Sequence, residues 1–86
     1  MANLDILYFA WVRDGIGQDG ERIDHPGAHV TITEVIAMMA ARGGDYARVL
    51  GDPGKLRAAL DQNFVALDSP LGAGTELALF PPVTGG

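Results

Sequence analysis

Three stretches of the 86-residue chain have the residue pattern of β-strands. Residues 4–12 are rich in β-branched and aromatic side chains, and every even position there is apolar or amphipathic. Residues 21–25 form a shorter candidate, which follows a turn region rich in Gly and Asp at 13–20. Residues 75–80 place two leucines on one face of a last strand. We therefore expect the first two strands to pair as a hairpin, with the even positions of the first facing the core.

The clearest periodic signal is that of an amphipathic helix that begins after Thr31. Thr31 and Glu34 have the spacing of a capping box, in which each side chain accepts a hydrogen bond from the other residue's backbone N–H. The apolar positions that follow recur on one helical face: Ile32, Val35, Ile36, Met39 and Ala40. Gly43 or Gly44 is predicted to end the helix in the left-handed conformation.

The segment between this helix and the last strand is harder to interpret. Residues 45–50 are compatible with a further helical turn, and residues 51–54 with a loop. The first half of 55–67 contains good helix formers whereas the second half alternates like a strand, so local propensity leaves both structures open. A helix laid across one face of a small mixed sheet buries both apolar faces, which predicts an α+β fold. We expect one domain at residues 1–80 and an extended tail at 81–86.

Composition and charge narrow the range of functions. With 48% hydrophobic and 20% charged residues, the chain resembles a soluble globular protein. It has no apolar run near the roughly 20 residues that cross a membrane and no basic signal-peptide start, which predicts a cytoplasmic protein. The net charge of −5 disfavours nucleic acid and favours partners with basic patches. The absence of cysteine excludes disulfides, thiolate metal ligands and cysteine nucleophiles.

Two motifs in the body resemble ligand sites but lack the necessary context. Gly15, Gly17 and Gly20 match the G-x-G-x-x-G dinucleotide fingerprint, but a proline-containing segment without a helical stripe follows, so we interpret them as hairpin-loop glycines. His25 and His29 are four residues apart, but Pro and Gly between them interrupt a helix, so a solvated loop without metal is expected. No residue spacing indicates a catalytic triad or an acid/base pair.

The carboxyl-terminal segment "LFPPVTGG" is the remaining candidate for chemistry. After the last strand come two stiffening prolines, a small anchor and two glycines that fit a narrow channel: Pro81, Pro82, Val83, Thr84, Gly85 and Gly86. A frayed terminus is the alternative interpretation. The free carboxylate of Gly86 is ionised at neutral pH and is a poor electrophile, so chemistry there requires activation by another enzyme, for example as an acyl adenylate.

The segment "FPPVTGG", at the end of this order of elements, resembles the small subunits of molybdopterin synthase, a family of ubiquitin-like sulfur carriers. The resemblance covers the whole chain and includes the opening "YFAWVRDGIG" and the closing "GAGTELALFPPVTGG". It implies a ubiquitin-like β-grasp fold, with a mixed sheet of four to five strands, one main helix across it and a flexible Gly-Gly tail. It also implies that residues 55–67 are mainly strand. Asp61 and Thr75 depart from the usual pattern, in which an asparagine is frequent at the first position and an acidic residue stands at the second.

The resemblance further implies a mechanism. A ubiquitin-activating-like adenylating enzyme uses ATP to activate the Gly86 carboxylate, and a sulfur donor converts it to a thiocarboxylate. The tail then inserts into the large synthase subunit, where the sulfur passes to cyclic pyranopterin monophosphate to form the molybdopterin dithiolene. The chain itself would be a non-catalytic subunit of a heterotetramer, with no permanently bound cofactor. A carrier for a thiamine-type pathway, a ubiquitin-like protein modifier and a plain interaction module are the alternatives.

Strand parity predicts a docking face for these partners. Phe9 and Phe80 lie on the outward faces of their strands, and Phe64 shares parity with Gln62, so the three phenylalanines are expected to form an exposed apolar patch. The alternative is that loops or the helix cover them.

Overall fold

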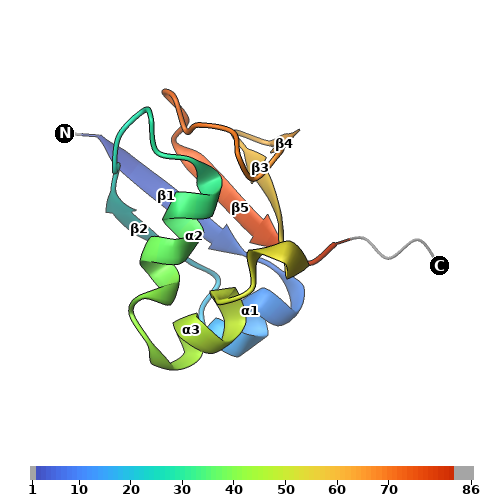
Figure 1. Ribbon diagram of the computed structural model, residues 1–86. Helices are drawn as coiled ribbons and strands as arrows, with labels where there is room; N and C mark the ends of the chain where they lie inside the picture. The colour runs from blue at the N-terminus through green and yellow to red at the C-terminus, as the bar shows by residue number, and fades with distance from the viewer. Residues whose placement is uncertain (1, 83–86) are drawn as a thin grey trace.

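The computed structural model describes residues 2–82 of the chain. Its strands are β1 (Asn3–Tyr8), β2 (Gly20–Asp24), β3 (Arg57–Leu60), β4 (Asn63–Val65) and β5 (Glu76–Phe80). Its helices are α1 (Ala10–Ile16), α2 (Ile32–Ala40) and α3 (Gly44–Leu50), with a 3-10 turn, η1 (Pro53–Lys55). Figure 1 shows α2 lying across one face of the sheet, with α1 and α3 side by side near the end of β1. The predicted α+β architecture is confirmed.

The five strands form one mixed sheet in the order β2-β1-β5-β3-β4. β1 is antiparallel to β2 and parallel to β5, while β3 is antiparallel to both β5 and β4. β5 is therefore a central strand that is hydrogen-bonded on both sides, and it is the strand from which the tail departs (Figure 1).

The core lies between the sheet and the helices. Alternate positions of the two central strands are fully buried, as the sequence predicts, and apolar residues of all three helices join them. The largest buried side chains are Tyr8, Leu4, Ile6, Ile32, Ile36, Met39, Leu50, Leu56, Leu71, Leu77, Leu79 and Val12. Because each buried aliphatic side chain contributes about 1.5–3 kcal/mol, this cluster supplies most of the driving force for folding.

The expected first strand is too long, and part of the expected turn region is helical. β1 ends at Tyr8, and α1 occupies positions assigned from sequence to the strand and to the turn. Ala10 has a φ of 53°, which redirects the chain at this junction. α1 buries Val12 and packs on α3, where a Cβ at Gly15 would lie 2.4 Å from Val49 Cγ2. Tertiary packing therefore overrides the local strand pattern.

The main helix begins where predicted and ends earlier. Thr31 and Glu34 form both hydrogen bonds of the capping box. The helix ends at Ala40, before either candidate glycine, and Gly43 instead precedes α3, the predicted additional helical turn.

The ambiguous segment is mainly strand, as the family resemblance implies. It contributes β3 and β4, joined by a two-residue turn in which Asp61 and Gln62 have φ values of 50° and 70°. Two consecutive left-handed residues are typical of a tight hairpin turn. This hairpin places β3 beside β5 and brings β4 to the edge of the sheet.

Candidate functional site

The root of the tail is held by the centre of the sheet. Phe80, the last residue of β5, pairs with Arg57 of β3, and the neighbouring Leu79 accepts a hydrogen bond of 3.2 Å from the backbone N–H of Phe9. Pro81 and Pro82 continue from this anchored end and are half-buried. The fixed φ of proline gives the departing chain a defined direction. The other predicted tail residues lie outside the described residues: Val83, Thr84, Gly85 and Gly86.

Two of the three predicted docking phenylalanines, Phe64 and Phe80, lie on the sheet face opposite the core, since their strand neighbours Val65 and Leu79 pack into the core. Phe64 and Phe80 contact each other, with ring centroids 5.8 Å apart and planes tilted by 59°. Phe64 is 84% exposed and Phe9 is 46% exposed. Tyr8 pairs with Leu79, so one step further along these parallel strands Phe9 comes beside Phe80. The structure thus places Phe80 on the central strand β5 and Phe64 on the edge strand β4. Phe9 lies just after the end of β1, at the N-cap of α1, rather than on the expected strand.

A groove opens beside these rings, and we call it the tail-root groove. It has a volume of about 320 Å³ and is lined by Arg57, Ala58, Phe64, Val65, Phe80 and Pro82. Its walls are largely apolar, with one guanidinium at the edge. Sequence reasoning missed Arg57, although its alternation with buried Leu56 and Ala58 places it on the outward face.

Trp11 is a second residue that sequence reasoning missed. It was assigned to the first strand but lies on α1, where its side chain is 43% exposed. The signal that could have located it is the spacing of Val12 and Ile16, four residues apart, which is typical of a helical face.

On the opposite side of the sheet, a polar cluster ties the helices to the strands. Glu21 of β2 accepts hydrogen bonds from the Tyr8 hydroxyl (2.8 Å), the Tyr46 hydroxyl (2.8 Å), Gln18 Nε2 (3.0 Å) and Arg42 Nη1 (2.6 Å). Burial opposes ionisation of Glu21, but the hydrogen bonds donated by Arg42 and the two tyrosines outweigh it and lower its pKa. Burial and the bond to Glu21 raise the pKa of Tyr8. All these donors are satisfied within the cluster, so its role is structural.

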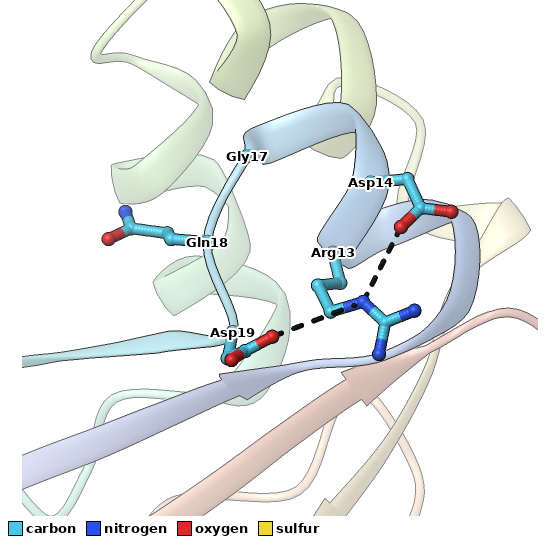
Figure 2. Close-up of a pocket in the computed structure, with 5 residues that line it drawn as sticks. All are labelled: Arg13, Asp14, Gly17, Gln18 and Asp19. Atoms are coloured by element: carbon cyan, nitrogen blue, oxygen red, sulfur yellow. Dashed lines mark hydrogen bonds and ion pairs between the residues drawn. The ribbon is translucent and has the colours of Figure 1, made fainter.

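The glycine-rich segment after β1 has the wrong geometry for a dinucleotide. A pocket lies here, and Figure 2 draws the residues that line it: Arg13, Asp14, Gly17, Gln18 and Asp19. Gly17, with a φ of 91°, ends α1, and a strand rather than a helix begins at Gly20. The Arg13 guanidinium is already paired with the carboxylates of Asp14 (3.4 Å) and Asp19 (4.0 Å), as the dashed lines in Figure 2 show.

His25 lies in a loop, as expected, but its ring is half-buried and hydrogen-bonded within the protein rather than solvated. Its Nε2 lies 3.1 Å from the carbonyl oxygen of Gly74, and its Nδ1 accepts a hydrogen bond from the Gly27 N–H at 3.1 Å. These contacts tie the β2–α2 loop to the loop before β5. Among residues 2–82, no group of three or more His, Cys, Asp or Glu side chains has the arrangement of a metal site, and no helix is long and apolar enough to cross a membrane.

Comparison with known protein families shows to which family the chain belongs. The model of the ThiS family matches residues 6–86, which is nearly the whole chain and includes the tail. The chain belongs to the ThiS family.

Individual relatives agree with this assignment. The chain is 42% identical over 85 residues to the molybdopterin synthase sulfur carrier subunit of Escherichia coli, covering 96% of this chain and 99% of that one. It is 39% identical over 83 residues to the protein of the same name from Haemophilus influenzae, with the same coverage. The resemblance inferred from the tail and the order of elements is thereby confirmed.

A solved structure of a third relative shares the fold. The crystal structure of small archaeal modifier protein 1 from Haloferax volcanii matches with a TM-score of 0.72 and 27% identity, covering 96% of this chain and all of that one. By sequence the two proteins are 34% identical over 82 residues, 91% of this chain and 94% of the relative. The ubiquitin-like expectation for this ThiS-family chain is confirmed by this match.

Proposed function

We propose that this ThiS-family chain is the sulfur carrier subunit of a molybdopterin synthase. The observation that carries the proposal is its identity of about 40% to two proteins of that name over nearly their full length, together with a tail that ends in Gly-Gly.

In this proposal the carboxylate of Gly86 is the reacting group. An adenylating enzyme joins it to the α-phosphate of ATP and releases pyrophosphate, which converts a poor electrophile into an acyl adenylate. A sulfur donor then displaces AMP and leaves a thiocarboxylate. The large synthase subunit binds the loaded tail, and the sulfur passes from Gly86 to cyclic pyranopterin monophosphate. Pro81, Pro82, Val83, Thr84 and Gly85 form the inserted segment.

Docking to the large subunit uses the face that surrounds the tail root. Phe64 and Phe80 supply apolar area on the side of the sheet away from the core, and the half-exposed Phe9 adds to it beside the end of β5. The Phe64 ring is the most exposed of the three. Large exposed aromatic side chains of this kind are enriched in protein interfaces.

Deletion of Gly86 tests the proposal. The shortened chain should fold like the wild type, since it keeps every residue of the core described within residues 2–82. It should transfer no sulfur when assayed with the large subunit and the activating enzyme. Circular dichroism checks the folding, and product formation checks the transfer. Transfer that survives the deletion would contradict the proposal.

A protein modifier is the second candidate function, favoured by the similarity to small archaeal modifier protein 1. A modifier would use the same activated carboxylate to acylate lysine side chains of other proteins. The appearance of conjugates that depend on Gly86 would support this function, and their absence would favour the carrier.

A further inference from the structure

One arginine stands apart from the other four in its charge environment. Arg13, Arg22, Arg42 and Arg48 are each ion-paired with a carboxylate, and the closest pairs have N–O distances of 3.4, 2.7, 2.6 and 2.9 Å in that order. Within residues 2–82, Arg57 joins no such pair. Its Nη1 donates only to the carbonyl oxygen of Leu56, at 2.9 Å, which leaves its charge uncompensated by the described part of the chain.

Arg57 lies where its charge can contact a partner protein that binds around the tail. It lines the tail-root groove together with Phe64 and Phe80, and it pairs in register with Phe80, where the tail begins. Lys55, two residues earlier, is likewise absent from the ion pairs of residues 2–82. A chain with a net charge of −5 therefore presents positive charge beside an apolar groove at the root of its tail.

We propose that the tail-root groove receives a segment of the large synthase subunit in which an Asp or Glu carboxylate stands beside an apolar side chain. The apolar side chain packs against the Phe64 and Phe80 rings, and the carboxylate accepts hydrogen bonds from the Arg57 guanidinium. Charge complementarity argues for this occupant, since a guanidinium at the edge of an apolar surface recognises a planar carboxylate through paired N–H donors. The inference rests on the proposed function and makes Arg57 a specificity-determining residue of the complex.

The test is the affinity of purified variants for the large subunit, measured by isothermal titration calorimetry. Arg57→Glu should weaken binding by about tenfold or more, because two carboxylates then face each other, and Arg57→Gln should weaken it by a smaller factor. Arg48→Glu, on α3, is the matched control because it carries the same change of charge on the helical side of the molecule. It should stay within about twofold of the wild type. The wild-type advantage over Arg57→Gln should shrink at high salt.

Several results would overturn the inference. Equal affinities of the wild type and both Arg57 variants for the large subunit would show that no partner carboxylate binds Arg57 in the groove. An equal loss for Arg48→Glu would assign the effect to overall charge. If the wild type does not bind the large subunit, both the proposed function and this inference are wrong. If it binds with an affinity that does not depend on Arg57, only the inference is wrong.

Two other occupants give distinct signatures. A dimer of the wild-type chain at micromolar concentration that Arg57→Glu abolishes would assign the groove to a second copy. The remaining possibility is that Arg57 pairs with the chain's own terminal carboxylate, which a chain ending in a carboxamide lacks. If Arg57→Glu no longer weakens binding of the large subunit in the amidated chain, that carboxylate is the partner of Arg57. We expect no dimer, and an undiminished Arg57 effect in the amidated chain. Replacing the Asp or Glu of the large subunit that pairs with Arg57 by Lys should restore the binding of the Arg57→Glu variant to the large subunit.

Discussion

At the residue scale, the two positions that depart from the usual family pattern form one interaction. The Asp61 carboxylate accepts hydrogen bonds from the backbone N–H groups of Thr75 (3.0 Å) and Glu76 (3.1 Å). These bonds lower the pKa of Asp61 and tie the β3–β4 turn to the start of β5. An acidic residue at position 75 would set a second negative charge beside this carboxylate. The Asp61 carboxylate is therefore compatible with the uncharged Thr75 beside it.

This pairing predicts a non-additive effect of mutation. Thr75→Glu should destabilise the wild-type chain, because it adds a like charge next to Asp61, and should cost less in an Asp61→Asn background, where that charge is absent. Chemical denaturation of the wild type, both single variants and the double variant measures the coupling. Strictly additive changes in the free energy of unfolding would show that the two side chains do not interact.

At the element scale, Glu21 is the point where several elements meet. Its donors come from β1, the α1–β2 loop, the α2–α3 loop and α3, and its side chain is only 17% exposed. Arg42 also lies over the Tyr46 ring, 5.1 Å from its centroid. One carboxylate thus fixes α3 and the α2–α3 loop against the edge of the sheet.

Glu21→Gln should destabilise the protein by about 2 kcal/mol at neutral pH, since hydrogen bonds to a charged acceptor are lost or weakened. The pKa of Glu21 is lower in the folded state than its usual value of about 4.3 in an unfolded chain. Its ionisation therefore stabilises the fold above that pH, and the stabilisation is lost as the pH falls through the folded value.

Urea denaturation of both proteins across this pH range measures the difference. The gap in unfolding free energy between the wild type and Glu21→Gln should narrow as the pH falls below about 4.3. The other carboxylates with a lowered pKa, such as Asp5 and Asp61, are common to both proteins and cancel in the comparison. A gap of constant size at every pH would contradict the role given to Glu21.

Elements whose signals are local could be predicted from the sequence, and those set by distant contacts could not. The capping box at Thr31 and the alternation in β5 are encoded within a few residues, and both were located. α1 depends on the contact of Gly15 with Val49, more than 30 residues away, so its local strand pattern was misleading. In the same way, the outward position of Phe64 and Phe80 follows from strand parity, whereas the lack of an ion pair at Arg57 within residues 2–82 depends on where the carboxylates of distant segments lie.

At the scale of the whole molecule, the fold separates a helical side from an aromatic side. The helices cover one face of the sheet (Figure 1). Phe64 and Phe80 lie on the other face, where they line the tail-root groove. A partner that engages the tail can therefore contact the aromatic face without disturbing the core.

Phe64→Asp should weaken binding of the large subunit by about tenfold or more while changing the free energy of unfolding by less than about 1 kcal/mol, because the ring is 84% exposed. Met38→Asp on α2 is the matched control, since Met38 is 48% exposed on the helical side, and it should bind like the wild type. Titration calorimetry and thermal denaturation provide the two measurements. Equal affinities for both variants would place the docking face elsewhere.

The central claim is that Gly86 carries sulfur. Intact-mass spectrometry of the chain, produced together with its adenylating enzyme and sulfur donor, tests it most directly. The account predicts a species in which one oxygen atom is replaced by sulfur at the carboxyl terminus of Gly86, and no such species when Gly86 is deleted. An unchanged mass, or Gly86 found only in amide linkage to lysines of other proteins, would contradict it.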